Sequence, residues 1–499
     1  MKADLEDVQR IVLRGTPWLA ARHLLIGFDG QPPLHGLARL LQTMRITAAG
    51  DTKPTVQFSL GFTRRGLEGA AVPDHVLACF AMKSPAFWAG AAKRAAGQLG
   101  LVQDSAPDLW APGFAFEHLD AVLSLHGDDE RVLARSAGEV EDMLKGRLPR
   151  ISVALLPATT VLPPPEGLAE AEAQAPAAAA AQGRRRRRDQ WVHFGFLDGL
   201  SRVGIRGATA QTDWQKCDPS SRHEAGEFVL GHAQDSGANP WVAGPGLRVW
   251  PEEVRSFFHN GSFGVLQQVQ QDVAAFERYV TQVASAEKLH PDEVKAKLCG
   301  RTPAGRPLAV PHQPDPHADF GYAGDPDGHG CPFGSHIRRM NPRLHRPAEL
   351  PPQQGPALAV EGLAHFRRSR PLLRRGMPYG PAWNEKEPAP GLDRGLIGQF
   401  FCASIEDQFE HLLGQWAERV PIGSPDGGGA RDPLIGAHGP GDGPFEIPQP
   451  GHSPRRLHGL RPFTRTRGVA YLFYPSLTTL EGLVDERLWL PEDKGGQTW

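Results

Sequence analysis

Short apolar stretches, each bounded by turn-forming or charged residues, recur through the first third of the chain. Four of them are 21–28 (ARHLLIGF), 56–62 (VQFSLGF), 121–125 and 151–156. Their length and apolar composition predict β-strands. Residues 37–44 and 86–99 instead repeat their apolar positions at helical spacing, so they predict two helices.

Helical spacing is stronger in the second half of the chain. Apolar residues three or four positions apart predict helices over 265–283 and over 405–419. Residues 469–474 (VAYLFY) predict a buried strand near the end of the fold. Strands and helices do not alternate regularly, and no GxGxxG motif follows a strand. The pattern therefore favours an α+β fold over a doubly wound parallel sheet.

The composition changes between Pro163 and Arg188, where prolines give way to Glu and Ala and then to consecutive arginines. Such a segment cannot bury enough apolar surface to pack. With 499 residues, the chain also exceeds the size at which one core keeps growing. We therefore predict an N-terminal domain at 1–162, a low-complexity insert or linker at 163–190, and a second domain at 191–499. The arginine run 184–188 is typical of a solvated charge cluster, because no aromatic residues are interleaved with it.

The overall charge is nearly balanced, with 54 basic and 56 acidic side chains. It gives no general attraction to nucleic acid or to an anionic membrane. The five cysteines are scattered, with no CxxC pair and no CxxCH motif for covalent haem attachment, so reduced thiols are expected. The amino terminus has no apolar signal segment, and no stretch approaches the ~18 apolar residues of a membrane span. A cytoplasmic location is therefore expected.

Candidate chemistry begins with the stretch 331–343 (CPFGSHIRRMNPR), which sets one histidine among three arginines. A neutral imidazole, here His336, can ligate iron, and guanidinium groups can hold carboxylates. Haem offers both an iron and two propionates. Arg338, Arg339 and Arg343 are therefore candidate propionate partners. A solvated or salt-bridged basic face is the alternative for each of them.

Two further segments carry an acid and another arginine on tight turns. Residues 195–199 (GFLDG) set Asp198 between two glycines, and residues 373–380 (LRRGMPYG) carry Arg374. Cleavage of a peroxide requires an acid-base group and a fixed positive charge near the reacting oxygens. An acid, a histidine and an arginine on separate loops therefore form a peroxidase-like set.

In these three segments the chain resembles the dye-decolorizing peroxidases, in particular the longer members with an HIRRxNPR box. The GxxDG motif of that family is met by 195–199, its proximal histidine box by 336–343, and its RxGxPYG turn by 374–380. The resemblance spans most of 1–480 and is weaker before about residue 191. It implies two ferredoxin-like domains with antiparallel sheets and flanking helices, of the dimeric α+β barrel type. It also implies one non-covalent haem b per chain, held by the second domain.

The resemblance assigns a role to each of these residues. His336 is the proximal haem iron ligand, Asp198 moves the proton, and Arg374 stabilises the charge that develops on the departing oxygen. Gly195 and Gly199 would let the backbone lie close to the haem face.

The proximal histidine also requires a carboxylate. A ligating imidazole usually donates the hydrogen of its other ring nitrogen to such a group, which makes the imidazole more basic. Glu406 or Asp407 is the expected partner.

The function that follows from the resemblance is that of a haem peroxidase. Such an enzyme reduces hydrogen peroxide through a ferryl intermediate and then oxidises a small aromatic or dye-like donor in one-electron steps.

Two other functions stay open. A haem-binding or haem-handling protein with little peroxidase activity would use the same His336 and arginines but would not need Asp198. A metal-dependent hydrolase would use His312, His317 and His329, with Asp319 nearby, although their spacing matches no structural zinc template.

Overall fold

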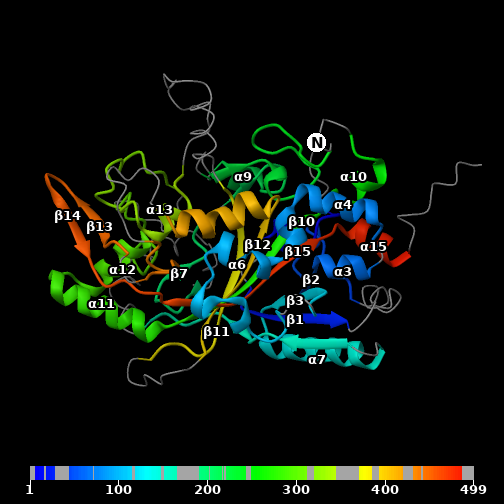
Figure 1. Cartoon of the computed structure of the whole chain (residues 1–499), viewed down its shortest axis with the longest axis horizontal. Helices are drawn as coiled ribbons and strands as arrows, with labels where there is room; N and C mark the ends of the chain where they lie inside the picture. The colour runs from blue at the N-terminus through cyan, green and yellow to red at the C-terminus, as the bar shows by residue number, and fades with distance from the viewer. Residues whose placement is uncertain are drawn as a thin grey trace, which may run out of the picture.

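The computed structural model shows helices packed around a large sheet whose strands come from both halves of the chain (Figure 1). It describes residues 6–15, 18–28, 44–70, 72–114, 118–147, 151–165, 190–201, 203–215, 217, 221–242, 249–311, 320–343, 370–384, 393–419, 431–439 and 442–485.

The first half contributes five strands and several helices to the described part. The strands are β1 (Ala20–Phe28), β2 (Val56–Phe62), β3 (Ala121–Gly127), β4 (Ile151–Leu155) and β5 (Thr159–Thr160). The helices are α1 (Arg10–Leu13), α3 (Arg64–Gly69), α4 (Asp74–Lys83), α5 (Pro85–Ala89), α6 (Ala91–Leu99) and α7 (Glu130–Arg147), with 3-10 turns η1 (Gln103–Ser105) and η2 (Pro107–Leu109).

The second half begins with short elements and then forms four long strands. The short elements are β6 (Gln190–Trp191), β7 (Leu197–Asp198), β8 (Gly204–Ile205), α9 (Gln211–Trp214), β9 (Arg222–His223) and η4 (Ala225–Glu227). The long strands are β10 (Ser262–Gln271), β11 (Leu373–Tyr379), β12 (Gly395–Cys402) and β15 (Thr464–Tyr474). The hairpin strands are β13 (Phe445–Gln449) and β14 (His452–Leu457).

The helices of the second half include two consecutive π-helices. The α-helices are α10 (Glu252–Phe258), α11 (Val273–Glu287), α12 (Pro291–Cys299), α13 (His336–Met340) and α15 (Leu477–Asp485). The π-helices are η7 (Ile405–Glu410) and η8 (Leu412–Ala417).

Each half of the chain has the strand order of a ferredoxin-like unit. In the first half the order across the sheet is β4-β1-β3-β2, and in the second half it is β15-β10-β12-β11. Numbered within each half, both orders read 4-1-3-2, and all these pairs are antiparallel. Both halves therefore fit the βαββαβ motif, and the predicted α+β class with two ferredoxin-like units is confirmed.

The two sheets join into a closed barrel. Phe473 of β15 pairs with Phe62 of β2, and Tyr379 of β11 pairs with Thr159 of β5. Strand β5 also pairs with β1, which pairs with β3, so the ring of strands closes. A closed ring leaves few free strand edges. The domain boundaries predicted at 162 and 190 stay predictions, but strands from both sides of them share one barrel.

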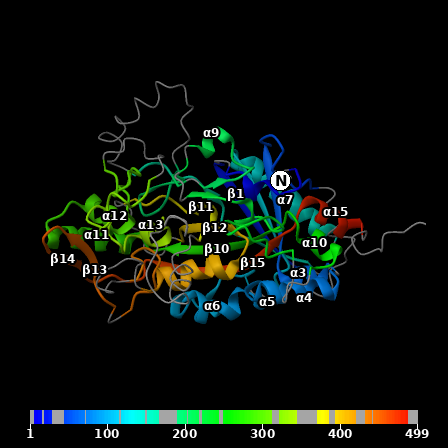
Figure 2. The ribbon, with the colours of Figure 1, turned by 90° about the horizontal axis from the view of Figure 1, so that it is seen from above.

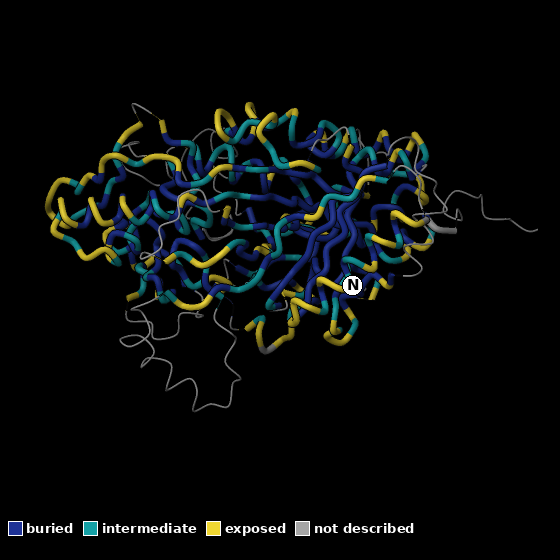
Figure 3. The backbone as a smooth tube through the Cα atoms, turned by 90° about the horizontal axis from the view of Figure 1, so that it is seen from below, coloured by how far each residue is buried: buried dark blue, intermediate teal, exposed yellow. Residues whose placement is uncertain are grey.

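Both faces of the barrel strands are buried (Figure 3). The outer face packs against α4, α5, α6 and α7 through one apolar cluster, which includes Leu24, Phe80 and Phe473. The inner face carries a second cluster, with Leu25, Leu266 and Tyr474. The described residues contain no helix with the length and apolar character of a membrane span. The cytoplasmic location stays a prediction.

The structure corrects one predicted helix and confirms most predicted strands. Strands β1, β2, β3, β4 and β15 match the predicted strands. Residues 265–283 are instead the strand β10 followed by α11, where the Asp272 carboxylate accepts a hydrogen bond from the Ala275 amide and begins the helix. The prediction was wrong because β10 is buried on both faces, so its apolar and polar residues do not alternate as they do in a half-buried strand. Its valines also continue the helical spacing of the apolar residues in α11.

Two other predicted helices differ in part. Gly90, at φ +80°, divides the predicted 86–99 helix into α5 and α6. Residues 405–419 do coil, but as the π-helices η7 and η8. Most of the predicted 37–44 helix, the arginine run 184–188, and His312, His317 and Asp319 lie outside the described residues.

Candidate active site

His336 is the first residue of α13 and is held by a buried carboxylate. Its Nδ1 atom lies 2.9 Å and 3.1 Å from the two carboxylate oxygens of Asp432, whose side chain is fully buried. The short helix begins after Ser335, whose hydroxyl donates to the Lys297 carbonyl of α12 at 2.6 Å. The Nε2 atom makes no hydrogen bond with a described residue, so it is the ring nitrogen left for a metal.

The surroundings of Asp432 favour its ionised form. Burial alone would raise its pKa, but the charge and hydrogen bond of His336, together with the Arg339 guanidinium, lower the pKa below the usual range. The backbone amides of Leu434 and Ile435 also donate to its Oδ1 atom, at 2.9 Å and 3.1 Å. An ionised partner keeps hydrogen on Nδ1 and the lone pair on Nε2.

The prediction of Glu406 or Asp407 as this partner is therefore wrong. Glu406 instead accepts hydrogen bonds from the Ser84 hydroxyl and from the Ala86 amide at the start of α5. Asp407 is mostly exposed and pairs with Arg370 at 3.2 Å. Within the π-helix η7, the Glu406 carboxylate faces the helices of the first half and the Asp407 carboxylate faces solvent. The carboxylate that reaches His336 belongs to Asp432, which follows η8 in the chain.

All three arginines near His336 have structural partners. Arg338 pairs with Asp325 at 3.0 Å, donates to the Cys331 carbonyl at 2.6 Å, and lies between the rings of Tyr322 and Phe333. It therefore holds the loop before α13. Its guanidinium is engaged and its side chain is buried, and the prediction that Arg338 binds a cofactor stays a prediction.

Arg339 and Arg343 contact different elements. Arg339 donates to the Trp416 carbonyl of η8 at 2.9 Å and to the Arg419 carbonyl, so it joins α13 to the π-helix. Its contact with a propionate stays a prediction. The Arg343 guanidinium lies 4.1 Å from the ring centroid of Phe320. Arg343 also has a left-handed backbone, at φ +50°, which a residue with a side chain rarely adopts. Of the three, Arg343 stays the candidate for an anionic group.

Strand β11 sends its two adjacent arginines to opposite sides. Arg375 faces the barrel interior, where it donates to the Ile11 and Val12 carbonyls at the end of α1 at 3.0 Å and 2.9 Å. Arg374 is exposed on the outer side, and no described residue pairs with it. Alternation along a strand therefore makes Arg374 the arginine that can face a ligand.

The outer face around Arg374 is open and apolar. Phe400 of β12 lies directly opposite Arg374, Gly398 lies opposite Gly376, and Leu396 lies opposite Pro378. A Cβ atom at Gly376 would meet nothing closer than 3.7 Å. A flat ligand can approach the backbone at that position.

The segment that carries Asp198 is anchored to the same strand. The His193 Nε2 atom bonds the Tyr379 carbonyl at the end of β11, at 2.7 Å, and burial lowers the pKa of His193 to about 4. A neutral His193 therefore ties 190–199 to β11. Asp198 ends β7 and is exposed, and no described residue pairs with its carboxylate.

Both glycines of this segment have positive φ angles. Gly195 has φ +82° and Gly199 has φ +73°, a region that favours glycine. These angles shape the tight turns on either side of Asp198. The prediction that Gly195 and Gly199 contact a haem stays a prediction.

Known proteins with similar sequences are named as peroxidases. No family model matches the chain. A multifunctional dye peroxidase from Amycolatopsis sp. is 27% identical over 96% of this chain and 96% of its own length. A dye-decolorizing peroxidase from Mycetinis scorodonius is 24% identical over 86% of this chain and 76% of its own length. The chain is similar in sequence to dye-decolorizing peroxidases over most of its length.

The solved structures agree on the fold of this family. A fungal peroxidase of this type from Auricularia auricula-judae superposes with a TM-score of 0.71 at 20% identity, covering 97% of this chain and 99% of the other. An ancestral D-type dye-decolorizing peroxidase also has a TM-score of 0.71, at 23% identity. The ferredoxin-like α+β architecture is therefore that of the dye-decolorizing peroxidases.

Dye-decolorizing peroxidases are haem enzymes, and the residues of this chain fit that group. His336 offers Nε2 to an iron while its Nδ1 atom is held by Asp432. The outer face of β11 and β12 combines Arg374 with the half-buried Leu396 and Phe400, which suits a flat apolar ring next to a polar reactant. The donor set is that of haem ligation by a histidine.

Sequence reasoning missed Asp432 and His193. Asp432 is 96 residues from His336 in the sequence and follows a glycine-rich stretch. Its one local signal is the Asp-Pro pair before an apolar turn, which predicts a carboxylate that accepts backbone amides. His193 lies two residues before the GxxDG motif, and a lone histidine gives no signal for the carbonyl that it bonds.

The structure gives no support to the alternative of a metal-dependent hydrolase site at His312, His317 and His329. His312, His317 and Asp319 lie outside the described residues, and His329 is exposed. Among the described residues no group of three or more His, Cys, Asp or Glu side chains could hold a metal ion.

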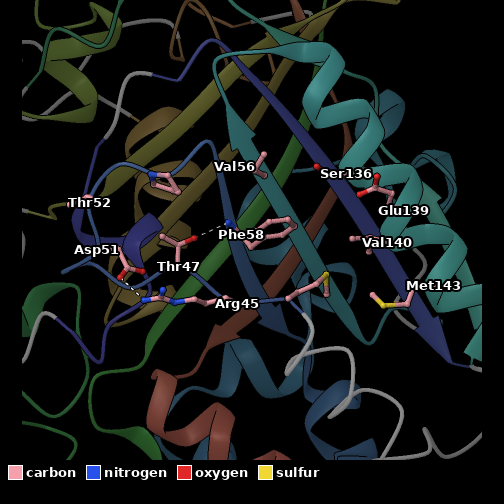
Figure 4. A pocket seen from close by; sticks show the side chains of 12 residues that line it. Arg45, Thr47, Asp51, Thr52, Val56, Phe58, Ser136, Glu139, Val140 and Met143 are labelled. Carbon is pink, nitrogen blue, oxygen red and sulfur yellow. Dashed lines mark hydrogen bonds and ion pairs between the residues drawn. The ribbon is translucent and has the colours of Figure 1, made fainter.

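A hollow of about 500 Å³ lies among residues of the first half of the chain (Figure 4). It is lined by residues 44–58 before and along β2 and by the face of α7 that carries Val140 and Met143. Arg45 and Asp51 form an ion pair at its rim, 2.8 Å long. No predicted site residue lines it.

Proposed function

We propose that this chain is a haem peroxidase that reduces hydrogen peroxide and oxidises aromatic or dye-like donors in one-electron steps. The observation that carries the proposal is the hydrogen bond between His336 Nδ1 and the fully buried Asp432. A histidine held in this way is a basic, oriented ligand, and a carboxylate is the usual second partner of a metal-bound imidazole. The relatives named as peroxidases support the same reading.

The cofactor that we propose is one non-covalent haem b, bound through His336. Haem supplies, when bound, the redox chemistry that splits peroxide and removes electrons from a donor. The chain has no CxxCH motif that would attach haem covalently. Arg343 is the candidate for one propionate, because a guanidinium stacked on the Phe320 ring has a fixed plane and can bond a carboxylate with two hydrogens.

Asp198 and Arg374 have different roles in the reaction with peroxide. The Asp198 carboxylate accepts the proton from the inner peroxide oxygen and returns it to the outer oxygen, which then leaves as water. The Arg374 guanidinium stabilises the negative charge that develops on the departing oxygen. Both side chains are exposed and unpaired within the described chain, so both can reach a reactant without first breaking an ion pair.

The test is a visible absorption spectrum of haem-loaded protein before and after one equivalent of hydrogen peroxide. The wild type should show a Soret band that shifts on addition of peroxide. His336→Ala should lose that band or change it to the spectrum of weakly bound haem. Asp198→Asn should keep the band but react with peroxide more slowly, by on the order of 10²-fold.

Arg375→Leu is the control for Arg374→Leu in the same assay. Arg374→Leu should slow the peroxide reaction by on the order of 10²-fold with little loss of stability. Arg375→Leu should lower the melting temperature instead, because it leaves the Ile11 and Val12 carbonyls without a donor. A His336-dependent band that never responds to peroxide would favour the haem-handling alternative.

A further inference from the structure

The strands of the barrel carry no acidic side chain. The sheet has nine strands, and eight of them form the closed ring β3-β2-β15-β10-β12-β11-β5-β1, with β4 outside it. None of these eight strands contains an aspartate or a glutamate. Figure 2 shows β1, β10, β11, β12 and β15 together in the middle of the molecule, with α3, α4, α5 and α6 along one side. The interior therefore receives no negative charge from the strands that enclose it.

The inner face of the barrel carries basic side chains instead. Side chains alternate along a strand, so His126 faces inward with Val122 of β3, and Arg375 faces inward with Tyr379 of β11. The rings of His126 and His23 lie edge to face, with centroids 5.7 Å apart. Burial lowers the pKa of both histidines, so both are neutral at neutral pH. Arg375 therefore brings a permanent positive charge into the interior.

Arg375 forms no ion pair with a described residue. It donates to the Ile11 carbonyl at 3.0 Å, to the Val12 carbonyl at 2.9 Å and to the Arg374 carbonyl at 3.0 Å. A guanidinium carries more N–H donors than these three bonds use, so donors are left for another acceptor. Burial lowers the pKa of Arg375 to about 10, and no acidic side chain of the described chain acts against that shift. A charge withdrawn from water in this way is costly unless an opposite charge meets it.

Unused hydrogen-bonding groups lie close to this charge. Gln57 of β2 lies directly opposite His126 of β3. Both polar atoms of the Gln57 side chain, and the Nδ1 atom of His126, are buried without a hydrogen-bond partner in the described part of the chain. After burial, the positive charge of Arg375 is the second cause that lowers the pKa of His126, so the two side chains are near each other. Directly opposite residues have Cβ atoms about 5 Å apart, so Gln57 and His126 can contact the same small ligand.

The size of the barrel limits what can bind there. Gln399 of β12 lies directly opposite Arg375, and its Nε2 atom donates across the barrel to the Ser124 hydroxyl of β3 at 2.9 Å. His23 bonds the same hydroxyl at 2.9 Å. The interior of a barrel of about eight strands has room for its side chains and for no more than a small ligand. An occupant between Arg375 and Gln57 must therefore be small.

We propose that the barrel interior binds one small monovalent inorganic anion, of the size of chloride, between Arg375, His126 and Gln57. The remaining N–H groups of Arg375, the Gln57 amide and the Nδ1–H of a neutral His126 donate to the ion. The ion supplies the opposite charge that the strands lack. A metal cation does not suit the site, because the barrel strands provide no carboxylate, and water alone would leave the charge of Arg375 unbalanced.

The test is the melting temperature of the haem-loaded full chain as sodium chloride replaces sodium gluconate at constant ionic strength. An ion that binds only the folded chain raises the melting temperature in a saturable way, and gluconate is too large for the barrel interior. The NMR line width of chloride, measured on the same samples, should increase in the presence of the wild type. The site lies on the other side of β11 from Arg374, so the result does not depend on the proposed peroxidase function.

Two substitutions of Gln57 test the location of the ion. Gln57→Leu removes buried polar atoms that have no partner, so the variant should fold. The chloride concentration that gives half of the stabilisation should rise by on the order of 10-fold, because a hydrogen bond to a charged group is lost. Gln57→Glu places a carboxylate next to Arg375 in the position of the ion. Its melting temperature should no longer depend on chloride.

Arg465→Leu is the matched control. Arg465 also belongs to a barrel strand, but its side chain is 54% exposed and pairs with Asp104 at 3.2 Å. Arg465→Leu should keep the chloride dependence of the wild type. A wild-type melting temperature that does not change when chloride replaces gluconate would overturn the inference. Equal chloride dependence in the wild type and in both Gln57 variants would overturn it as well, because the ion would then bind elsewhere.

Discussion

The inside of the barrel contains polar residues that are fully enclosed. His23 bonds the Ser124 hydroxyl at 2.9 Å, and Gln399 donates to the same hydroxyl at 2.9 Å. The His126 Nδ1 atom has no hydrogen-bond partner, and neither polar atom of the Gln57 side chain has one. Buried polar atoms are costly unless ordered water satisfies them. The two buried histidines make the stability of the barrel interior depend on pH.

The first prediction concerns His126. Burial, followed by the nearby Arg375, lowers its native pKa to about 4, whereas an unfolded histidine has a pKa near 6.5. Above pH ~6.5 the side chain is neutral in both states, and the stability is fully present. Below that pH only the unfolded state takes up the proton, so stability falls as the pH drops toward 4, by on the order of 3 kcal/mol.

Urea unfolding between pH 7 and pH 4.5 measures this loss. His126→Gln should reduce the pH dependence, because the amide does not titrate, although the buried His23 keeps a contribution of the same sign. His452→Gln, at an exposed position, should leave the slope unchanged. Equal slopes in His126→Gln and in the wild type would contradict the prediction.

The second prediction concerns the proximal carboxylate. Asp432→Asn keeps an oxygen that can accept from His336 and from the Leu434 and Ile435 amides, but it removes the negative charge. Haem affinity or peroxide reactivity should fall by about 10-fold to 100-fold. Haem titration followed by stopped-flow absorption with peroxide measures both.

Asp407→Asn is the control for Asp432→Asn. Asp407 is another carboxylate of the second half, but its side chain is 57% exposed and bonds Arg370 rather than His336. Its variant should behave as the wild type does in both assays. Equal effects of the two variants would show that charge loss anywhere near the site is enough.

The packing of the π-helix η8 on α6 depends on a close backbone approach at a glycine. Gly414 of η8 lies against the end of α6, and a Cβ atom there would stand 1.8 Å from the Gln98 carbonyl oxygen. The π-helices in turn hold α5 and α6 through Glu406 and Glu410. This interface joins the helices of the first half to the element that carries the Arg339 contact to α13.

The third prediction follows from that interface. Gly414→Ala should separate η8 from α6 and lower the free energy of unfolding by about 1–3 kcal/mol, as overpacking does elsewhere. Gly97→Ala is the matched control on the facing helix, where a Cβ atom would meet nothing within 4 Å. Gly97→Ala should stabilise the protein by about 0.5–1 kcal/mol through helix propensity. Thermal and urea unfolding distinguish the two, and a destabilised Gly97→Ala would contradict the assignment.

The barrel makes the two halves of the chain parts of one structure. The ring closes through pairs between β15 and β2 and between β11 and β5, each linking the two halves. The Arg94–Glu410 ion pair, at 2.5 Å, adds a third link outside the barrel. Separation of the halves would expose buried strand edges and leave the Glu410 charge without its partner, which is strongly unfavourable.

The fourth prediction is that the chain unfolds in one cooperative step despite its two ferredoxin-like units. Calorimetry of the protein should give a single transition whose calorimetric and van't Hoff enthalpies agree. A chain limited to residues 191–499 should lack the sharp transition, because β11 and β15 would each lose a neighbour. Two resolved transitions in the full chain would show that the halves are independent.

The sequence by itself determined the strands and named the candidate reactive residues. Local apolar runs specified β1, β2, β3, β4 and β15, because a short buried run needs no distant partner to be recognised. The spacing of Arg374 from Gly376 and Tyr379 distinguished it from Arg375, and the alternation of β11 supports that choice. The motifs around His336 and Asp198 were equally local.

Only the tertiary structure decided which distant groups meet. Asp432, rather than Glu406 or Asp407, reaches His336, because the chain passes through two π-helices and a further loop before it returns to α13. Burial on both faces of the closed barrel turned the apparent helix at 265–271 into the strand β10. Contacts across the barrel and between its covering helices join residues hundreds of positions apart, and no local pattern of side chains encodes such pairings.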